Sequence, residues 1–97
     1  MTEILFSNNA SKFLKKLKDK NLKNLFRKHI EAISENPENG EHKKGDLSGI
    51  YGSDFYYSGT NYEIAYVIEE IGADKKIIII SAGTRENFYE NLKKYWL

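Results

Sequence analysis

The chain has 97 residues, of which 40% are hydrophobic and 30% charged, and its formal net charge is +1. This length and composition predict one globular domain over residues 1–97. The chain has no cysteine and two histidines, which excludes disulfides and disfavours a zinc site. No apolar run is long enough to span a membrane, and the N-terminus lacks a signal-peptide pattern. We therefore expect a cytoplasmic protein that works without a metal, a cofactor or a membrane.

Charge is unevenly distributed along the chain. Residues 11–28 contain eight basic residues and one acidic residue, a local charge of +7, whereas the rest of the chain carries −6. This asymmetry predicts an acidic partner, either nucleic acid or an acidic protein segment. Alternatively, the lysines form the solvated faces of two amphipathic helices, and the two interpretations are compatible.

The N-terminal third predicts a strand followed by a helical hairpin. Residues 3–6 form a short apolar strand, and Ser7 or Asn8 can cap the helix that follows. After a break at residues 19–21, a second helix has apolar residues at three-and-four spacing. This helix ends before Pro37, because proline cannot continue it. Most of the +7 charge lies along the predicted hairpin.

The rest of the chain is mainly strand-like. Residues 50–57 and 62–71 are predicted strands joined by a turn at 58–61, and a second turn at 72–75 leads to a run of four isoleucines. Such a run suits a central strand that is covered on both faces. The predicted order is β-α-α-β-β-β-α, an α+β fold whose antiparallel sheet packs on the N-terminal helical hairpin, with a C-terminal helix.

Alternation assigns the side chains of the second strand to two faces. Tyr62, Ile64 and Tyr66 share the face that we expect to pack on the helical hairpin. Glu63 then lies on the opposite, more open face.

A candidate anion site lies where the isoleucine strand ends. Thr84 is a good N-cap for the C-terminal helix, whose first amides and dipole favour an anion. Arg85 adds a guanidinium there, Gly83 allows close approach, and Tyr89 lies on the same helix face as Arg85. A phosphate could then contact amides, a cation and a phenol together. On spacing alone, the alternative is an ordinary capped helix whose arginine pairs with a neighbouring acid.

Several segments in order carry a resemblance to a known family. They are F-L-K-K-L, I-E-A-I-S-E-N-P, H-K-K-G-D-L-S-G-I-Y-G, N-Y-E-I-A-Y-V-I and G-T-R-E-N-F-Y, which together span nearly the whole chain. In order and spacing they resemble the RelE/ParE superfamily of type II toxin–antitoxin toxins. The resemblance implies a small cytoplasmic toxin that is held inactive by an antitoxin encoded beside it. RelE-like members cut mRNA on the ribosome, whereas ParE-like members poison DNA gyrase.

The resemblance also implies roles for individual residues. Metal-independent RNA cleavage needs a base for the 2′-hydroxyl, a cation for the phosphorane charge and an acid for the leaving oxygen. By the RelE-like pattern G-x-R-x-x-x-Y, Arg85 stabilises phosphate charge and Tyr89 stacks on or orients the substrate. Glu63 stands where RelE-like toxins carry an arginine. It could be the general base or only an ion-pair partner of Arg85.

Three further residues are candidates for RNA binding. Lys43 and Lys44 could supply positive charge at the sheet entrance, although a lysine pair in a loop is also ordinary solvated surface. Tyr56 could stack on single-stranded bases, although tyrosines are also common in strands. His29 is predicted to be a packed or boundary residue, and His42 a minor acid–base candidate.

The sequence therefore predicts a type II toxin whose partners are a cognate antitoxin, mRNA and the ribosome. Its predicted activity is that of a ribosome-dependent mRNA endoribonuclease that inhibits translation. The alternatives are a DNA gyrase inhibitor and a catalytically inert, toxin-like binding module.

Overall fold

The computed structural model describes residues 2–96, apart from the side chain of Tyr95. Its elements in chain order are β1 (Thr2–Phe6), α1 (Asn8–Lys16), α2 (Lys20–Glu35), the 3-10 turn η1 (Pro37–Asn39), β2 (Glu41–His42), the 3-10 turn η2 (Gly45–Leu47), β3 (Tyr51–Tyr57), β4 (Thr60–Ile71), β5 (Asp74–Thr84) and α3 (Phe88–Trp96). The predicted order of helices and main strands is confirmed. The two-residue strand β2 was not predicted.

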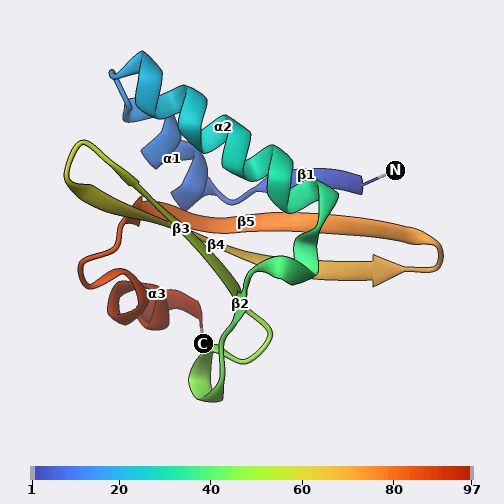
Figure 1. The fold of residues 1–97 in the computed structure, drawn as a ribbon. Coiled ribbons are helices and arrows are strands. Elements are labelled where there is room, and N and C mark those ends of the chain that lie inside the picture. Colours follow the sequence, from blue (N-terminus) through green and yellow to red (C-terminus); the bar gives the residue numbers. More distant parts are fainter. Residues whose placement is uncertain (1, 97) are drawn as a thin grey trace.

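The strands form one sheet in the order β1-β5-β4-β3-β2 (Figure 1). The predicted antiparallel meander is confirmed in β3, β4 and β5. At the edge of the sheet β1 pairs in parallel with β5, so the sheet is mixed rather than purely antiparallel. Alternation within β1 cannot reveal this direction, because it depends on the path of the chain through α1 and α2.

Two-residue turns set the register of the meander. Ser58 and Gly59 join β3 to β4 with φ values of 50° and 80°, the positive pair that a type I′ hairpin requires. Gly72, with φ of 62°, begins the turn between β4 and β5. In the resulting register Glu63 lies between Asp54 of β3 and Gly83 of β5.

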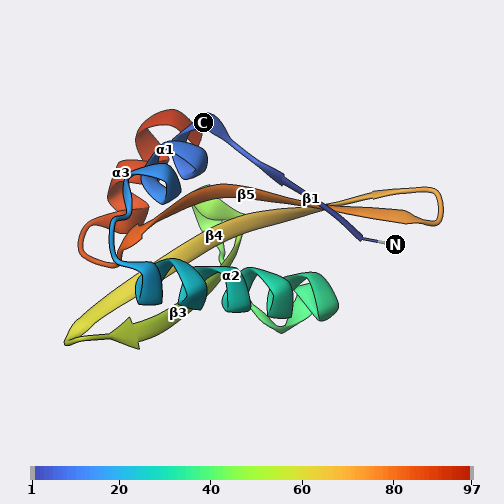
Figure 2. The same cartoon turned by 90° about the horizontal axis from the view of Figure 1, so that it is seen from above.

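The sheet is covered on both faces, since Figure 1 shows the α1–α2 hairpin above the strands and α3 below them. Figure 2 shows that the β4–β5 hairpin projects beyond the helices. The α1–α2 hairpin buries Phe26, Ile64 and Tyr66 on one side, which confirms the predicted assignment of faces. On the other side α3 packs Phe88 and Leu92 onto a second cluster of buried residues from the sheet and η2. The face that carries Glu63 is therefore covered near this residue, and the prediction of an open face is wrong.

The start of the C-terminal helix also differs from the prediction. β5 continues through Thr84, and the amide of Arg85 donates to the carbonyl of Asn61 at 2.9 Å. A turn with Asn87 at φ 57° follows, and α3 begins at Phe88. The predicted N-cap at Thr84 and its set of free helix amides are thus absent, because pairing with β4 keeps this segment extended.

The first helix cap is as predicted. The Ser7 hydroxyl accepts from the amide of Ala10 at 3.1 Å and donates to the carbonyl of Ile80 at 2.8 Å. It therefore caps α1 and ties the helix to β5. Within residues 2–96, no helix is long and apolar enough to cross a membrane.

Candidate functional site

Glu63 is the centre of a cluster of ionisable side chains on the α3 side of the sheet. It is only 3% exposed, although it is a carboxylic acid on β4, the central strand of the sheet. Burial raises the pKa of Glu63, while the hydrogen bond from Tyr89 and the charge of Lys43 act in the opposite direction. A buried carboxyl with a raised pKa is typical of general bases and acids, and it also occurs in structural networks.

Tyr89 brings α3 to this carboxyl. Its Oη donates to Oε2 of Glu63 at 2.5 Å, and its ring packs edge-on against Phe88. Burial and the hydrogen bond to Glu63 both raise the pKa of Tyr89 well above its ordinary range. The phenol therefore stays protonated and orients the carboxyl.

Arg85 lies at the exposed rim of the cluster. Its Nε is 4.0 Å from Oε1 of Glu63, and its Nη1 is 3.3 Å from Oδ2 of Asp54. Asn61 also donates to Asp54, at 3.2 Å. The arginine side chain is 56% exposed, so a phosphate from solution can reach it. The predicted proximity of Arg85 and Glu63 is confirmed, although the two residues come together through the β4–β5 pairing and not through a helix N-terminus.

Lys43 approaches the same cluster from the segment between β2 and η2. Its ammonium lies over the Tyr89 ring, 4.3 Å from the centroid, which is cation–π geometry. It also pairs with Glu41, and this contact lowers the pKa of the Glu41 carboxyl. Lys43 is therefore a component of the site, whereas Lys44 is exposed and has none of these contacts.

Gly52 on β3 makes the convergence possible. A Cβ atom at this position would lie 2.7 Å from Oε2 of Glu63 and 3.1 Å from Cε of Lys43, and it would overlap the Tyr89 hydroxyl. Only a residue without a side chain leaves room for the three groups. Sequence reasoning missed Gly52, Asp54 and Glu41 as parts of the site. Alternation does place Gly52 and Asp54 on one face of β3, but their proximity to Glu63 depends on the register with β4.

The other candidates lie at some distance from this contact network. Tyr56 is 74% exposed and follows Asp54 on the same face of β3, so its ring is available to a ligand. His42 stacks on Tyr51 with ring centroids 4.6 Å apart. His29 stacks on Phe55 at 4.3 Å, and burial lowers the pKa of this histidine, which confirms it as a boundary residue.

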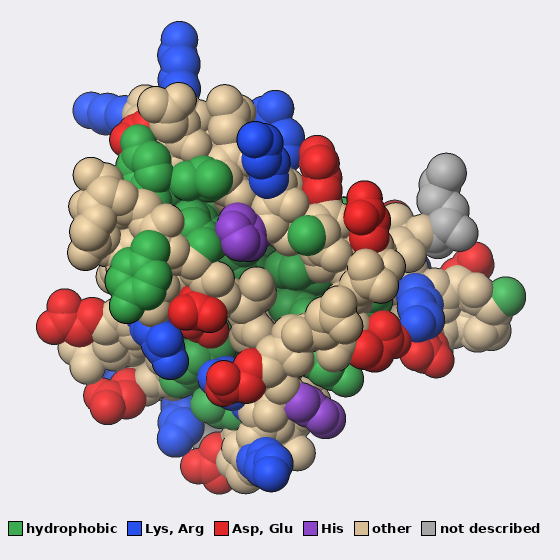
Figure 3. All heavy atoms as spheres, in the orientation of Figure 1, with side chains coloured by type: hydrophobic (Ala, Val, Ile, Leu, Met, Phe, Trp, Pro, Cys, Tyr) green, Lys and Arg blue, Asp and Glu red, His purple; other side chains and the backbone are tan. Residues whose placement is uncertain are grey.

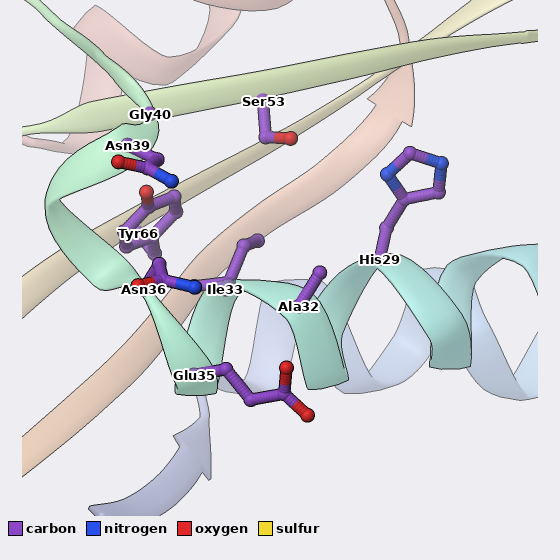
Figure 4. Close-up of a pocket in the computed structure, with 9 residues that line it drawn as sticks. All are labelled: His29, Ala32, Ile33, Glu35, Asn36, Asn39, Gly40, Ser53 and Tyr66. Atoms are coloured by element: carbon purple, nitrogen blue, oxygen red, sulfur yellow. The ribbon is translucent and has the colours of Figure 1, made fainter.

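A polar cavity of about 190 Å³ lies on the other side of β3 (Figure 4). It is enclosed by the C-terminal part of α2, η1 and Ser53, and His29 and Tyr66 lie at its wall. Among the described residues that line it there is no lysine or arginine, so the cavity is not suited to a phosphate. The Tyr66 hydroxyl is already occupied, since it donates to the carbonyl of Pro37 at 2.7 Å.

The site as a whole combines two cations, three carboxyl groups and a phenol. Each cation has a described acidic partner: Lys43 pairs with Glu41, and Arg85 with Asp54. Within residues 2–96, no group of three or more histidine, aspartate or glutamate side chains could hold a metal ion. The chemistry available is proton transfer at a buried carboxyl next to an exposed guanidinium.

Comparison with known proteins identifies the class. Residues 4–93 match the family described as ParE-like toxin of type II bacterial toxin-antitoxin system. The chain belongs to this family, and it is a toxin of the RelE/ParE superfamily. No curated protein matches the sequence.

Solved structures of similar fold come from the same superfamily. The isolated E. coli RelE toxin is 22% identical with a TM-score of 0.68, and the match covers 98% of each chain. A chain of the intact E. coli RelBE toxin-antitoxin complex is 21% identical with a TM-score of 0.67, over 84% of this chain and 93% of that one. The YoeB/ParE toxin from Agrobacterium tumefaciens is 13% identical with a TM-score of 0.70, over 86% and 98%. At these identities the likeness establishes the fold.

Proposed function

We propose that this toxin is a metal-independent endoribonuclease that cuts mRNA on the ribosome and is held inactive by a cognate antitoxin. The observation that carries the proposal is the convergence of Glu63, Arg85 and Tyr89 on one rim of the sheet. The RelE-like pattern implies a role in cleavage for Arg85 and Tyr89, whereas Glu63 departs from that pattern and is proposed as the base because of its place in the cluster. The antitoxin is inferred from the family and from its structural relative in the RelBE complex.

The proposed reaction is attack of an RNA 2′-hydroxyl on the adjacent phosphate. Glu63 accepts the 2′ proton, the P–O5′ bond breaks, and the products are a 2′,3′-cyclic phosphate and a 5′-hydroxyl. The raised pKa of Glu63 makes its carboxylate a stronger base than an exposed glutamate would be. Arg85 stabilises the charge that develops on the phosphorane oxygens.

The remaining groups have supporting roles in this proposal. Tyr89 stays protonated and holds Glu63 through their 2.5 Å hydrogen bond. The ammonium of Lys43 is the candidate donor of a proton to the 5′ oxygen. Tyr56, which is 74% exposed, offers a ring on which a base can stack. A phosphate must displace Asp54 from Arg85, and this exposed ion pair costs little to break.

Substitutions of Arg85 and Glu63 test the proposal. Arg85→Ala should relieve growth arrest while the protein remains folded, because losing one preorganised donor costs on the order of 10²–10³ in rate. Glu63→Gln should abolish cleavage with little loss of RNA binding. The measurement is the mapping of mRNA ends after induction, beside circular dichroism of each purified variant. Full toxicity of a folded Arg85→Ala protein would refute the assignment of this cluster as the active site. Retained cleavage by Glu63→Gln would refute the assignment of Glu63 as the general base.

Gyrase inhibition is the second candidate. The balance of charge favours it, since Glu41, Asp54 and Glu63 outnumber Lys43 and Arg85 at the site and each cation has an acidic partner. Such a surface suits a protein target better than a polyanion. Induction would then cause DNA breaks and an SOS response while mRNA stays intact.

A further inference from the structure

An apolar groove lies on the helical-hairpin face of the sheet, opposite to the Glu63 cluster. Its floor and walls come from Phe6 of β1, Leu14 of α1, and Phe26 and Ile30 of α2, and its volume is about 220 Å³. Phe26 and Ile30 are buried, whereas Phe6 is 43% exposed. The groove is large enough for a leucine or phenylalanine side chain.

The polar part of the groove is basic. Lys23 and Arg27 complete its lining, one turn apart on the same face of α2, and no acidic residue is among the lining residues. Within residues 2–96, neither cation takes part in a described ion pair. The only acid in residues 11–28 is Asp19, which accepts hydrogen bonds from the amides of Asn21 and Leu22 and from the hydroxyl of Tyr57.

We propose that this groove docks a segment of the antitoxin in which a large apolar side chain is flanked by carboxylates. The inference rests on the antitoxin partnership proposed above and adds the chemistry and place of one contact. Burial of an apolar anchor in a pocket supplies affinity, and the carboxylates on Lys23 and Arg27 speed association and fix orientation.

Two other occupants fit the groove less well. A nucleic acid would use the cations and could stack a base on Phe6, but it has no apolar group to fill the floor formed by Leu14 and Ile30. A second copy of the chain would bring two hairpins of charge +7 together, and like charges repel. Figure 3 shows the basic side chains projecting from the hairpin along the upper part of the molecule. An acidic segment with an apolar anchor satisfies both properties of the surface.

Matched substitutions on β1 test the apolar contact. Phe6 and Leu5 are neighbours with exposed fractions of 43% and 40%, and strand alternation places them on opposite faces of the sheet. The antitoxin encoded by the adjacent reading frame is titrated into each purified toxin variant. Phe6→Ala should weaken binding about tenfold or more, whereas Leu5→Ala should change it by less than about twofold.

A second pair of variants tests the charges without altering a buried side chain. Lys23→Glu/Arg27→Glu is compared with Lys12→Glu/Lys28→Glu, which makes the same change in net charge at exposed positions of the same hairpin outside the groove. The groove variant should associate about tenfold more slowly than the control at low salt. The difference should shrink as salt screens the charges.

Each outcome has a separate meaning. Equal binding within both pairs would overturn the docking site while leaving the antitoxin partnership intact. Failure of the wild-type toxin to bind the adjacent gene product would instead contradict the partnership itself. Sedimentation of the free toxin as a dimer that Phe6→Ala dissociates would assign the groove to a second copy and overturn the proposal.

Discussion

Gly52→Ala should destabilise the protein through a clash that the structure locates to three side chains. The new methyl group would lie 2.7 Å from Oε2 of Glu63 and 3.1 Å from Cε of Lys43, and it would overlap the Tyr89 hydroxyl. These distances are shorter than the ordinary contact distance between non-bonded heavy atoms, which is about 3.5–4.0 Å. Overpacking of this kind costs about 1–3 kcal/mol.

Gly83→Ala is the matched control, because Gly83 lies beside Glu63 on the neighbouring strand and faces the same way. A methyl group there would have its nearest contact, with Phe88, at 3.9 Å. Both substitutions remove the same flexibility from the unfolded chain, a gain of about 0.4–1 kcal/mol that cancels between them. The two variants should therefore differ by the overpacking cost, which corresponds to about 4–8 °C in Tm for each kcal/mol.

Thermal and urea denaturation of both variants measure this difference. A Tyr89→Phe background sharpens the test, since it removes the hydroxyl that the Gly52→Ala methyl group would overlap. The cost of Gly52→Ala should then be smaller, with a coupling of about 0.5 kcal/mol or more between the two positions. Equal stability of Gly52→Ala and Gly83→Ala, with no coupling to Tyr89, would refute the account of how the site is packed.

Three further predictions concern stability. The folded-state pKa of Glu63 is raised above 4.5, so its contribution to stability is fully present below about pH 4 and is lost as pH rises through the raised value. In urea titrations, the free energy of unfolding of Glu63→Gln relative to wild type should therefore increase from acidic to neutral pH. The same difference between the two proteins at every pH would contradict this. Tyr66→Phe should cost about 1–3 kcal/mol, because it leaves the buried Pro37 carbonyl without its donor; unchanged urea unfolding would argue against that bond. Ser7→Ala should cost about 0.5–2 kcal/mol through loss of the α1 cap, whereas Ser34→Ala, whose hydroxyl only bonds back within its own helix, should stay within about 0.5 kcal/mol.

Local patterns in the sequence were sufficient for most of the fold. The helical hairpin, the cap at Ser7, the break before Pro37 and the two faces of β4 follow from periodicity and side-chain chemistry over a few residues. Each of these features depends on neighbours along the chain, so a window of sequence contains the information. The order of the helices and main strands followed from the same patterns and from the turn residues between them.

The candidate site depended on contacts between distant residues. Pairing with β4 keeps Thr84 extended, so α3 begins only at Phe88. The burial of Glu63 and the contact of Asp54 with Arg85 follow from the register of three strands and from the packing of α3. The sequence around Glu63 does not indicate that this residue is buried, because the helix that covers it, α3, begins 20 or more residues later in the chain. The sequence by itself therefore determined which residues line each face of β4. Only the tertiary structure decided that Glu63 is buried on its face while Arg85 beside it stays exposed, because both depend on strand register and on the packing of α3.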